Sequence, residues 1–173
     1  MNKAFFLDKD GTLVDNSQFP EVMPSHYILT EDILDGLKYI QNLGYKLIIF
    51  SNQSGIAKGR LSVEEVEEIF KILISKLAKE GIIINDYIYC PHQKSDNCDC
   101  KKPKLKLIFE SSKKHNLDLE KCFFVGDGKR DIMAGKNAGM KTILVLTGMG
   151  NHYKDIVDAD YVLENLNEIM SIL

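Results

Sequence analysis

The sequence lacks a hydrophobic run near the roughly 20 residues that a bilayer-spanning helix needs, and its N-terminus becomes charged too soon for a signal peptide. We therefore expect a cytoplasmic protein without membrane contact. It also lacks an excess of positive charge: 22 Lys and Arg against 25 Asp and Glu give a net charge of −3. With no overall positive field, nucleic acid is not an expected partner, and any anion must be held by a local site.

Proline is scarce, with 4 in 173 residues, and no Pro/Gly/Ser-rich linker or internal repeat divides the chain. A chain of this length is near the size of a single domain. We predict one domain over residues 1–173, working as a monomer.

Cysteine is also sparse, but three of the four lie within eleven residues, close to a histidine. Such clustering without a secretion signal favours metal over disulfides, and the alternative is a reduced loop that happens to contain cysteine. Three thiolates and one imidazole form the ligand set of a closed tetrahedral zinc site. We predict structural Zn²⁺ that orders a loop over residues 90–102, with the ligands Cys90, His92, Cys98 and Cys100.

Short apolar runs alternate with longer amphipathic segments, which is typical of an α/β protein with a Rossmann-like parallel sheet flanked by helices. Nearly continuous apolar runs indicate strands that are covered on both faces. The predicted strands are residues 4–7, 46–50, 86–89, 122–125, 141–146 and 161–163. The predicted helices are residues 32–43, 62–80, 105–115, 130–138 and 164–172.

Asp8 and Asp10 directly follow the first apolar strand. Ligands of an open α/β sheet bind outside the carboxyl ends of its strands, so both acids are expected to face the site. A carboxylate can attack phosphorus to form an aspartyl-phosphate. That chemistry also needs a hard cation, a proton donor for the leaving oxygen and donors for the phosphoryl oxygens. Taken alone, Asp-Gly after a strand is more often an ordinary turn.

Groups that meet these needs follow in order along the chain. The segment Ser51-Asn52-Gln53-Ser54 offers hydroxyl, amide and backbone donors at the end of the second strand. Lys101 and Lys102 precede a helix and could neutralise phosphoryl charge. A second acid pair, Asp127 and Asp131, follows the fourth strand, and Asp127 could complete an oxygen site for Mg²⁺ with Asp8.

The segments DKDGT, FSNQSG, Lys102-Pro103 and VGDGKRD resemble the four ordered motifs of the haloacid dehalogenase (HAD) superfamily of phosphatases. The resemblance implies that Asp8 is the nucleophile, Asp10 the general acid/base, Ser51 a phosphoryl donor and Lys102 a charge stabiliser. It also implies Mg²⁺ held by the Asp8 carboxylate, the Asp10 backbone carbonyl and Asp127. Asp131 is expected to contact these groups rather than to bind the metal directly. No segment is long enough for the large cap domain found in many relatives.

Together with YCPH and CDCKKP, these motifs are similar to those of the D-glycero-D-manno-heptose 1,7-bisphosphate phosphatases and the histidinol-phosphate phosphatases. This implies hydrolysis of a small phosphorylated sugar, with removal of the 7-phosphate. Lys101 stands where the heptose enzymes commonly have a substrate-recognising Arg, and Asn52, Gln53 and Ser54 are expected to contact substrate. The loops over residues 15–30 and 90–102 are expected to choose the substrate.

Three other functions stay open on the residues alone. The nearest is a histidinol-phosphate phosphatase. More distant are a polynucleotide 3′-phosphatase, against which the acidic balance counts, and a zinc-bearing binding module without catalysis.

Overall fold

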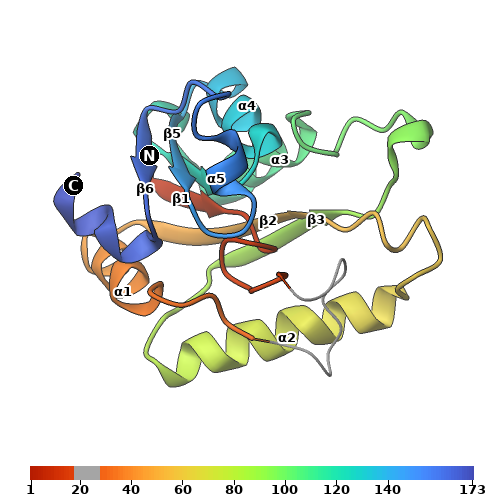
Figure 1. The fold of residues 1–173 in the computed structure, drawn as a ribbon, viewed down its shortest axis with the longest axis horizontal. Coiled ribbons are helices and arrows are strands. Elements are labelled where there is room, and N and C mark those ends of the chain that lie inside the picture. The colour runs from red at the N-terminus through yellow and green to blue at the C-terminus, as the bar shows by residue number, and fades with distance from the viewer. Residues whose placement is uncertain (18–27) are drawn as a thin grey trace.

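A computed structural model of the chain describes residues 1–17 and 28–173. Six strands form one parallel sheet in the order β3-β2-β1-β4-β5-β6 (Figure 1). The strands are β1 (Ala4–Leu7), β2 (Lys46–Asn52), β3 (Asp86–Cys90), β4 (Phe123–Gly126), β5 (Lys141–Val145) and β6 (Tyr161–Leu163). The predicted parallel α/β fold is confirmed.

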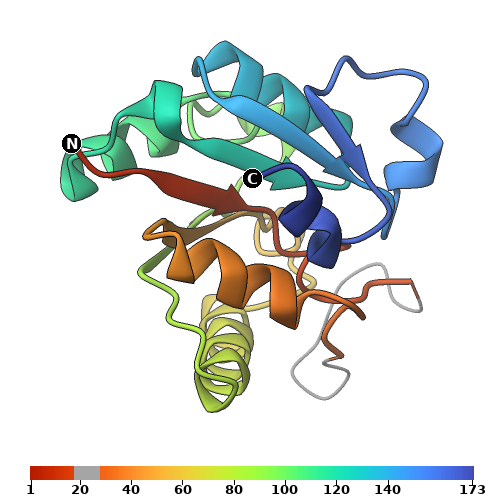
Figure 2. The same cartoon turned by 90° about the vertical axis from the view of Figure 1, so that its left-hand side faces the viewer.

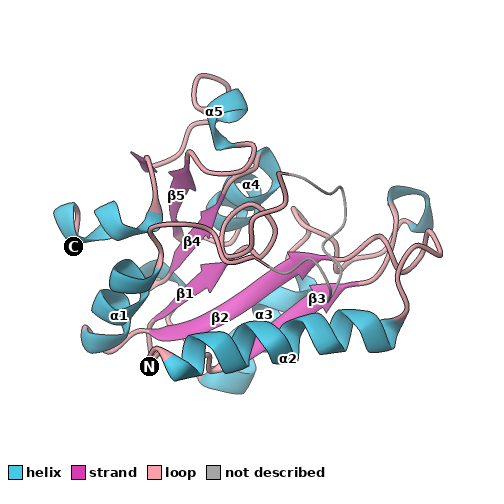
Figure 3. Ribbon diagram, turned by 60° about the horizontal axis from the view of Figure 1, so that its bottom comes forward, coloured by secondary structure: helices cyan, strands magenta, loops and turns pink. Residues whose placement is uncertain are grey.

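Successive side chains of the central strands point to opposite faces of the sheet, as the two-residue period of a strand requires. On β1, Phe5 and Leu7 are in one buried hydrophobic cluster and Phe6 is in the other. Helices α1, α2 and a C-terminal 3₁₀ helix cover the first cluster, and α3 and α4 cover the second (Figures 2 and 3). The helices are α1 (Leu34–Asn42), α2 (Val63–Lys79), α3 (Lys106–His115), α4 (Lys129–Asn137), α5 (Gly150–Tyr153) and the 3₁₀ segment Leu166–Ser171.

Local chemistry sets several helix ends. Ser62 accepts a hydrogen bond from the Glu65 N–H while the Glu65 carboxylate accepts one from the Ser62 N–H, which is the capping box that starts α2. Gly44 and Gly81 follow α1 and α2 with φ of 81° and 79°. This left-handed conformation ends a helix at little cost only where there is no Cβ.

In the C-terminal part, one expectation is wrong and one short helix was not predicted. The segment predicted as a helix over residues 164–172 is a 3₁₀ helix, Leu166–Ser171. Its apolar residues Leu166, Ile169 and Ile172 are three apart, a spacing that puts them on one side of a 3₁₀ turn. Helix α5 has four residues, too few to produce a periodic pattern, and sequence reasoning missed it.

The described chain contains no helix that is long and apolar enough to cross a membrane. Residues 18–27, the greater part of the predicted substrate loop over 15–30, lie outside the described residues. The strand order reverses between β1 and β4, and such a switch point places a crevice at the carboxyl ends of those strands.

Candidate active site

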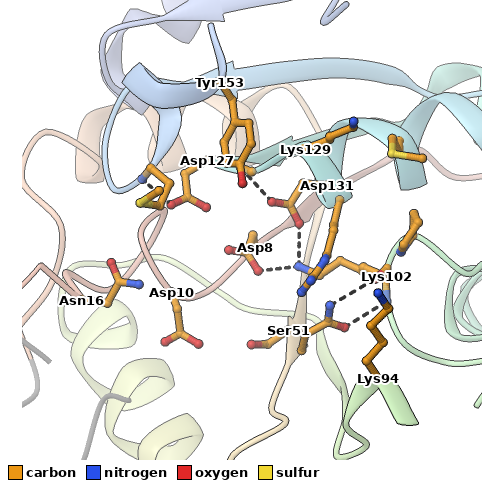
Figure 4. A pocket seen from close by; sticks show the side chains of 16 residues that line it. Asp8, Asp10, Asn16, Ser51, Lys94, Lys102, Asp127, Lys129, Asp131 and Tyr153 are labelled. Atoms are coloured by element: carbon orange, nitrogen blue, oxygen red, sulfur yellow. Dashed lines mark hydrogen bonds and ion pairs between the residues drawn. The ribbon is translucent and has the colours of Figure 1, made fainter. Parts of the chain in front are cut away.

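Three carboxylates meet at this switch point. Asp8 follows β1 and Asp127 follows β4, and the Asp8 N–H donates to the Val125 carbonyl at 2.9 Å, which joins the two strand ends. One oxygen each of Asp8, Asp127 and Asp131 lies within 4.8 Å of the others, and all three side chains are buried. They line a cavity of about 660 Å³ (Figure 4). Acids that are 123 positions apart in the chain thus form one site.

Lys102 supplies the positive charge at the centre of this cluster. Its Nζ lies 2.5 Å from Asp8 Oδ1 and 2.7 Å from Asp131 Oδ1, and it donates to the Phe50 carbonyl at 2.8 Å (Figure 4). Its side chain is 3% exposed. Burial alone would lower the pKa of this ammonium, but the Asp131 and Asp8 carboxylates raise it above its usual value. Lys102 is therefore a fixed cation that faces Asp8, the expected nucleophile.

Asn52 holds the backbone on which Lys102 sits. Its side-chain Oδ1 accepts from the Lys102 N–H at 2.9 Å, and its Nδ2 donates to the Lys102 carbonyl at 3.3 Å. Contacts to both the N–H and the carbonyl of this residue fix where the lysine side chain starts. The amide of Asn52 is thus engaged by the protein, and its predicted contact with substrate stays a prediction.

Asp127 is enclosed by a turn that sequence reasoning missed. Its Oδ2 accepts a hydrogen bond from the Met149 N–H at 2.8 Å. A Cβ on either Gly11 or Gly148 would lie 2.1 Å from this oxygen, so only glycine leaves room for the carboxylate. Thr147 Oγ1 donates to the Gly11 carbonyl at 2.7 Å and ties the two turns together. The signal was present: a Gly-rich turn, Thr147 to Gly150, follows a strand at the same sheet edge.

Asp10 lies beside Asp8, with its carboxylate turned away from it (Figure 4). One oxygen forms an ion pair with the buried Lys9, and the other accepts from Gln53 Nε2 at 2.9 Å. The same Gln53 amide contacts Ser51 Oγ at 2.6 Å. Gln53 thus links the expected acid/base to the expected phosphoryl donor, whereas its predicted contact with substrate stays untested.

The remaining predicted residues lie at different distances from the cavity. Ser51 lines it, whereas Ser54 is not among the residues that do. The Lys101 ammonium donates to the His92 carbonyl at 3.0 Å and lines a neighbouring cavity. Sequence reasoning did not single out Asn16 and Tyr153, which also border the main cavity (Figure 4).

The carboxylate cluster fits a hard divalent cation. Burial raises the pKa of Asp8 well above its usual value, with Lys102 opposing and the neighbouring acids adding to the effect. Burial likewise raises the pKa of Asp127 to about 6. Buried acids that repel one another in this way are stabilised by a shared cation, and oxygen ligands are those that Mg²⁺ prefers. Asp8 and Asp127, with Asp131 in reach, could therefore hold Mg²⁺.

The predicted zinc ligands also meet in space. Cys90 Sγ lies 3.6 Å from Cys98 Sγ and 3.1 Å from Cys100 Sγ, and His92 Nδ1 lies 3.2 Å from Cys100 Sγ. Ligands on a tetrahedral zinc ion are about 3.6 to 3.8 Å apart. Burial raises the pKa of the Cys98 thiol, but backbone N–H groups of Lys101 and Cys100 outweigh it and lower the pKa to about 7. Burial raises the pKa of the Cys90 thiol to about 12 and raises that of Cys100 as well, so zinc binding would release protons from these two thiols. The four ligand atoms are close enough together to hold a structural Zn²⁺.

Several known proteins are similar to this chain along most of its length. A family model described as HAD-hydrolase-like matches residues 99–169. The D-glycero-beta-D-manno-heptose-1,7-bisphosphate 7-phosphatase of Pasteurella multocida is 34% identical over an alignment of 181 positions, gaps included. The alignment covers 100% of this chain and 97% of that protein. The enzyme of the same name from Helicobacter pylori strain J99 is 37% identical over 148 residues, 84% of each chain.

A bifunctional histidine biosynthesis protein of Buchnera aphidicola is 31% identical over 144 residues, which cover 82% of this chain and 40% of that protein. Among solved structures, the D,D-heptose 1,7-bisphosphate phosphatase of B. bronchiseptica, complexed with magnesium and phosphate, has a TM-score of 0.90 at 26% identity. The match covers 99% of this chain and 97% of that one. The chain therefore belongs to the HAD-like phosphatases, in the family that contains the heptose-1,7-bisphosphate 7-phosphatases.

Proposed function

We propose that this protein is a Mg²⁺-dependent phosphomonoesterase that removes the 7-phosphate of D-glycero-D-manno-heptose 1,7-bisphosphate. The observation that carries the proposal is the buried Lys102, paired with Asp8 inside a cluster of three acids. The choice of substrate rests on relatives of that name, one of which aligns along the whole chain.

The reaction proceeds in two steps. Asp8 Oδ attacks phosphorus, the bond from phosphorus to the sugar oxygen breaks, and Asp10 donates a proton to the departing oxygen. Asp10 then takes a proton from a water that attacks the aspartyl-phosphate, which releases phosphate and restores Asp8. Because the Asp10 carboxylate is held by Lys9 and Gln53, its side chain must rotate to reach the leaving oxygen.

Fixed groups of the protein bind the phosphoryl group and neutralise its charge. Lys102 places an ammonium beside Asp8, and Ser51 Oγ, which lines the cavity, donates to a phosphoryl oxygen. Asp8, the Asp10 carbonyl and Asp127 would hold Mg²⁺, which would supply positive charge to neutralise the phosphoryl group. Asp131 binds Lys102 through one oxygen and accepts from the Gly128 N–H through the other, so it holds Lys102 in position.

Two variants test the residue roles. Asp8→Asn should abolish turnover while thermal unfolding shows a folded protein; Mg²⁺-dependent activity near the wild-type level would falsify the nucleophile assignment. Asp10→Asn should slow sugar phosphates more than aryl phosphates, because a good leaving group needs no proton. Equal losses of activity on both substrate types would contradict the assignment of Asp10 as the general acid.

Histidinol phosphate is the second candidate substrate, since the matching part of the histidine biosynthesis protein is 31% identical. Steady-state kcat/KM for histidinol phosphate and for both anomers of the heptose bisphosphate decides between them. A higher kcat/KM for histidinol phosphate would refute the heptose assignment.

We also propose that residues 1–173 form one domain that works as a monomer in the cytoplasm. The free thiols of the zinc loop suit a reducing compartment. Light scattering of the purified protein tests the oligomeric state.

A further inference from the structure

The turn after β5, residues 147–150, contacts the loops that follow two other strands. Thr147 Oγ1 donates to the Gly11 carbonyl at 2.7 Å, and the Met149 N–H donates to Asp127 Oδ2 at 2.8 Å. Gly11 lies in the loop after β1, and Asp127 follows β4. In the sheet β5 pairs with β4 but not with β1, so the turn reaches across the end of β4 to a residue 136 positions away. One short segment thus holds both loops that carry the expected Mg²⁺ ligands.

Close packing of the backbone leaves this turn little room to move. A Cβ on Gly148 would lie 2.7 Å from the Gly11 Cα. A Cβ on Gly150 would lie 1.8 Å from the carbonyl oxygen of Val145, the last residue of β5. The Gly150 N–H also donates to the Thr147 carbonyl at 2.8 Å, which closes the turn. The Thr147 hydroxyl is therefore presented to Gly11 from a closely packed support.

Gly11 has a backbone that needs such support. Its φ is 88°, and glycine has a wider choice of backbone angles than any other residue. The Gly11 N–H donates to the Val14 carbonyl at 2.8 Å, and the Thr147 hydroxyl donates to the Gly11 carbonyl. These two hydrogen bonds fix the peptide groups on either side of Gly11. One of these peptide groups contains the Asp10 carbonyl, which is an expected metal ligand.

Contact with substrate does not explain the Thr147 hydroxyl. Thr147 is not among the residues that line the active-site cavity, whereas Met149 in the same turn is. Among the described residues, the hydrogen-bond partner of this hydroxyl is the Gly11 carbonyl. Any effect of Thr147 on the site must therefore pass through the loop after β1.

We propose that Thr147 is a positioning residue for the Mg²⁺ site: its hydroxyl fixes the backbone of Gly11 and thereby the direction of the Asp10 carbonyl. The inference rests on the proposed function, from which it takes the metal ligands. The Met149 N–H fixes Asp127 from the same turn, so the turn sets the ligands of two loops relative to each other. Hydrogen bonds that orient metal ligands typically contribute a factor of about 10 to 100 to metal affinity.

The test measures the Mg²⁺ dissociation constant of substrate-free protein, obtained from the rise in unfolding free energy with Mg²⁺ concentration in urea. Thr147→Val replaces the hydroxyl by a methyl group of similar size and should raise this constant about tenfold or more. Thr147→Ser keeps the hydroxyl and should bind Mg²⁺ nearly as well as the wild type. The Mg²⁺ concentration that gives half-maximal phosphatase activity should shift by a similar factor in Thr147→Val.

Thr142→Val is the matched control, because it removes a hydroxyl from β5 itself. The Thr142 hydroxyl donates to Asp160 Oδ2 at 2.7 Å, the same length as the bond that Thr147 forms, and neither Thr142 nor Asp160 lines the cavity. Thr142→Val should lower stability in EDTA but change the Mg²⁺ dissociation constant by less than about twofold, because distant sites act independently.

Three results would overturn the inference. A loss of stability in EDTA with an unchanged Mg²⁺ dissociation constant in Thr147→Val would make the residue purely structural. Binding in Thr147→Ser as weak as in Thr147→Val would assign the effect to the methyl group rather than to the hydroxyl. Equal weakening in Thr142→Val would mean a general loosening around β5.

Failure of the proposed function is recognised separately. If the wild type binds Mg²⁺ but hydrolyses neither heptose bisphosphate nor histidinol phosphate, the substrate assignment is wrong, and the dissociation constants still decide the inference. If Mg²⁺ does not stabilise the wild type at all, the metal ligands are wrongly assigned and the inference fails with them.

Discussion

Lys102→Met should destabilise the metal-free protein strongly at alkaline pH and much less at acidic pH. The lysine is 3% exposed and lies between Asp8 and Asp131, whose side chains are 10% and 6% exposed. Removal of one partner from a buried ion pair costs about 3 to 5 kcal/mol. For a domain of this size, that corresponds to a fall in melting temperature of roughly 6 to 20 °C.

The pH dependence of this loss has a definite sign. Without the ammonium, nothing opposes the effect of burial on Asp8, so the folded-state pKa of this carboxyl, already raised, rises further. A carboxyl whose folded pKa exceeds its unfolded value contributes stability at low pH and loses it as pH rises through the folded pKa. The deficit of Lys102→Met should therefore be small near pH 5 and full near pH 8.

Mg²⁺ should restore part of the loss, because a divalent cation between Asp8 and Asp127 replaces the missing charge. Urea unfolding in EDTA and in Mg²⁺, at both pH values, measures the loss of stability, its pH dependence and its recovery in Mg²⁺. Lys104→Met, an exposed lysine two residues away, is the control and should change stability by less than about 0.5 kcal/mol. A Lys102→Met protein as stable as the wild type at pH 8 in EDTA would refute the assignment of Lys102 as the charge that holds the acids together.

Three further predictions concern the metal sites. In metal-free protein, the Asp127 pKa of about 6 lies above the usual value of 3.8 for this group, so Asp127 should lower stability by roughly 3 kcal/mol as pH rises from 4 to above 6. Asp127→Asn should remove that slope in urea unfolding, and an unchanged slope would contradict the raised pKa. Cys98→Ser should lose zinc in metal analysis and melt earlier, whereas Cys122→Ser should keep its zinc; zinc-free wild type made with adequate supply would refute the site. Gly148→Ala should weaken Mg²⁺ binding by calorimetry at least tenfold, because its Cβ would lie 2.1 Å from Asp127 Oδ2, while Gly59→Ala, which meets nothing within 4 Å, should not.

The order of the motifs was enough to predict much of this site. Asp8, Lys102 and Asp127 each follow a strand or precede a helix of one α/β series, and parallel strands bring such positions to one sheet edge. The zinc ligands were predictable because four soft ligands lie within eleven residues. The capping box at Ser62 was predictable because it depends on only four consecutive residues.

The sequence alone thus determined the fold class, the cluster of acids and the metal loop, since each depends on a local pattern or on strand order. Only the tertiary structure decided which partner each polar side chain binds. It turned the amides of Asn52 and Gln53 toward Lys102 and Asp10, and the ammonium of Lys101 toward the zinc loop. It also brought the Thr147 hydroxyl to the Gly11 carbonyl. Such choices depend on distances between segments far apart in the chain, which no local pattern encodes.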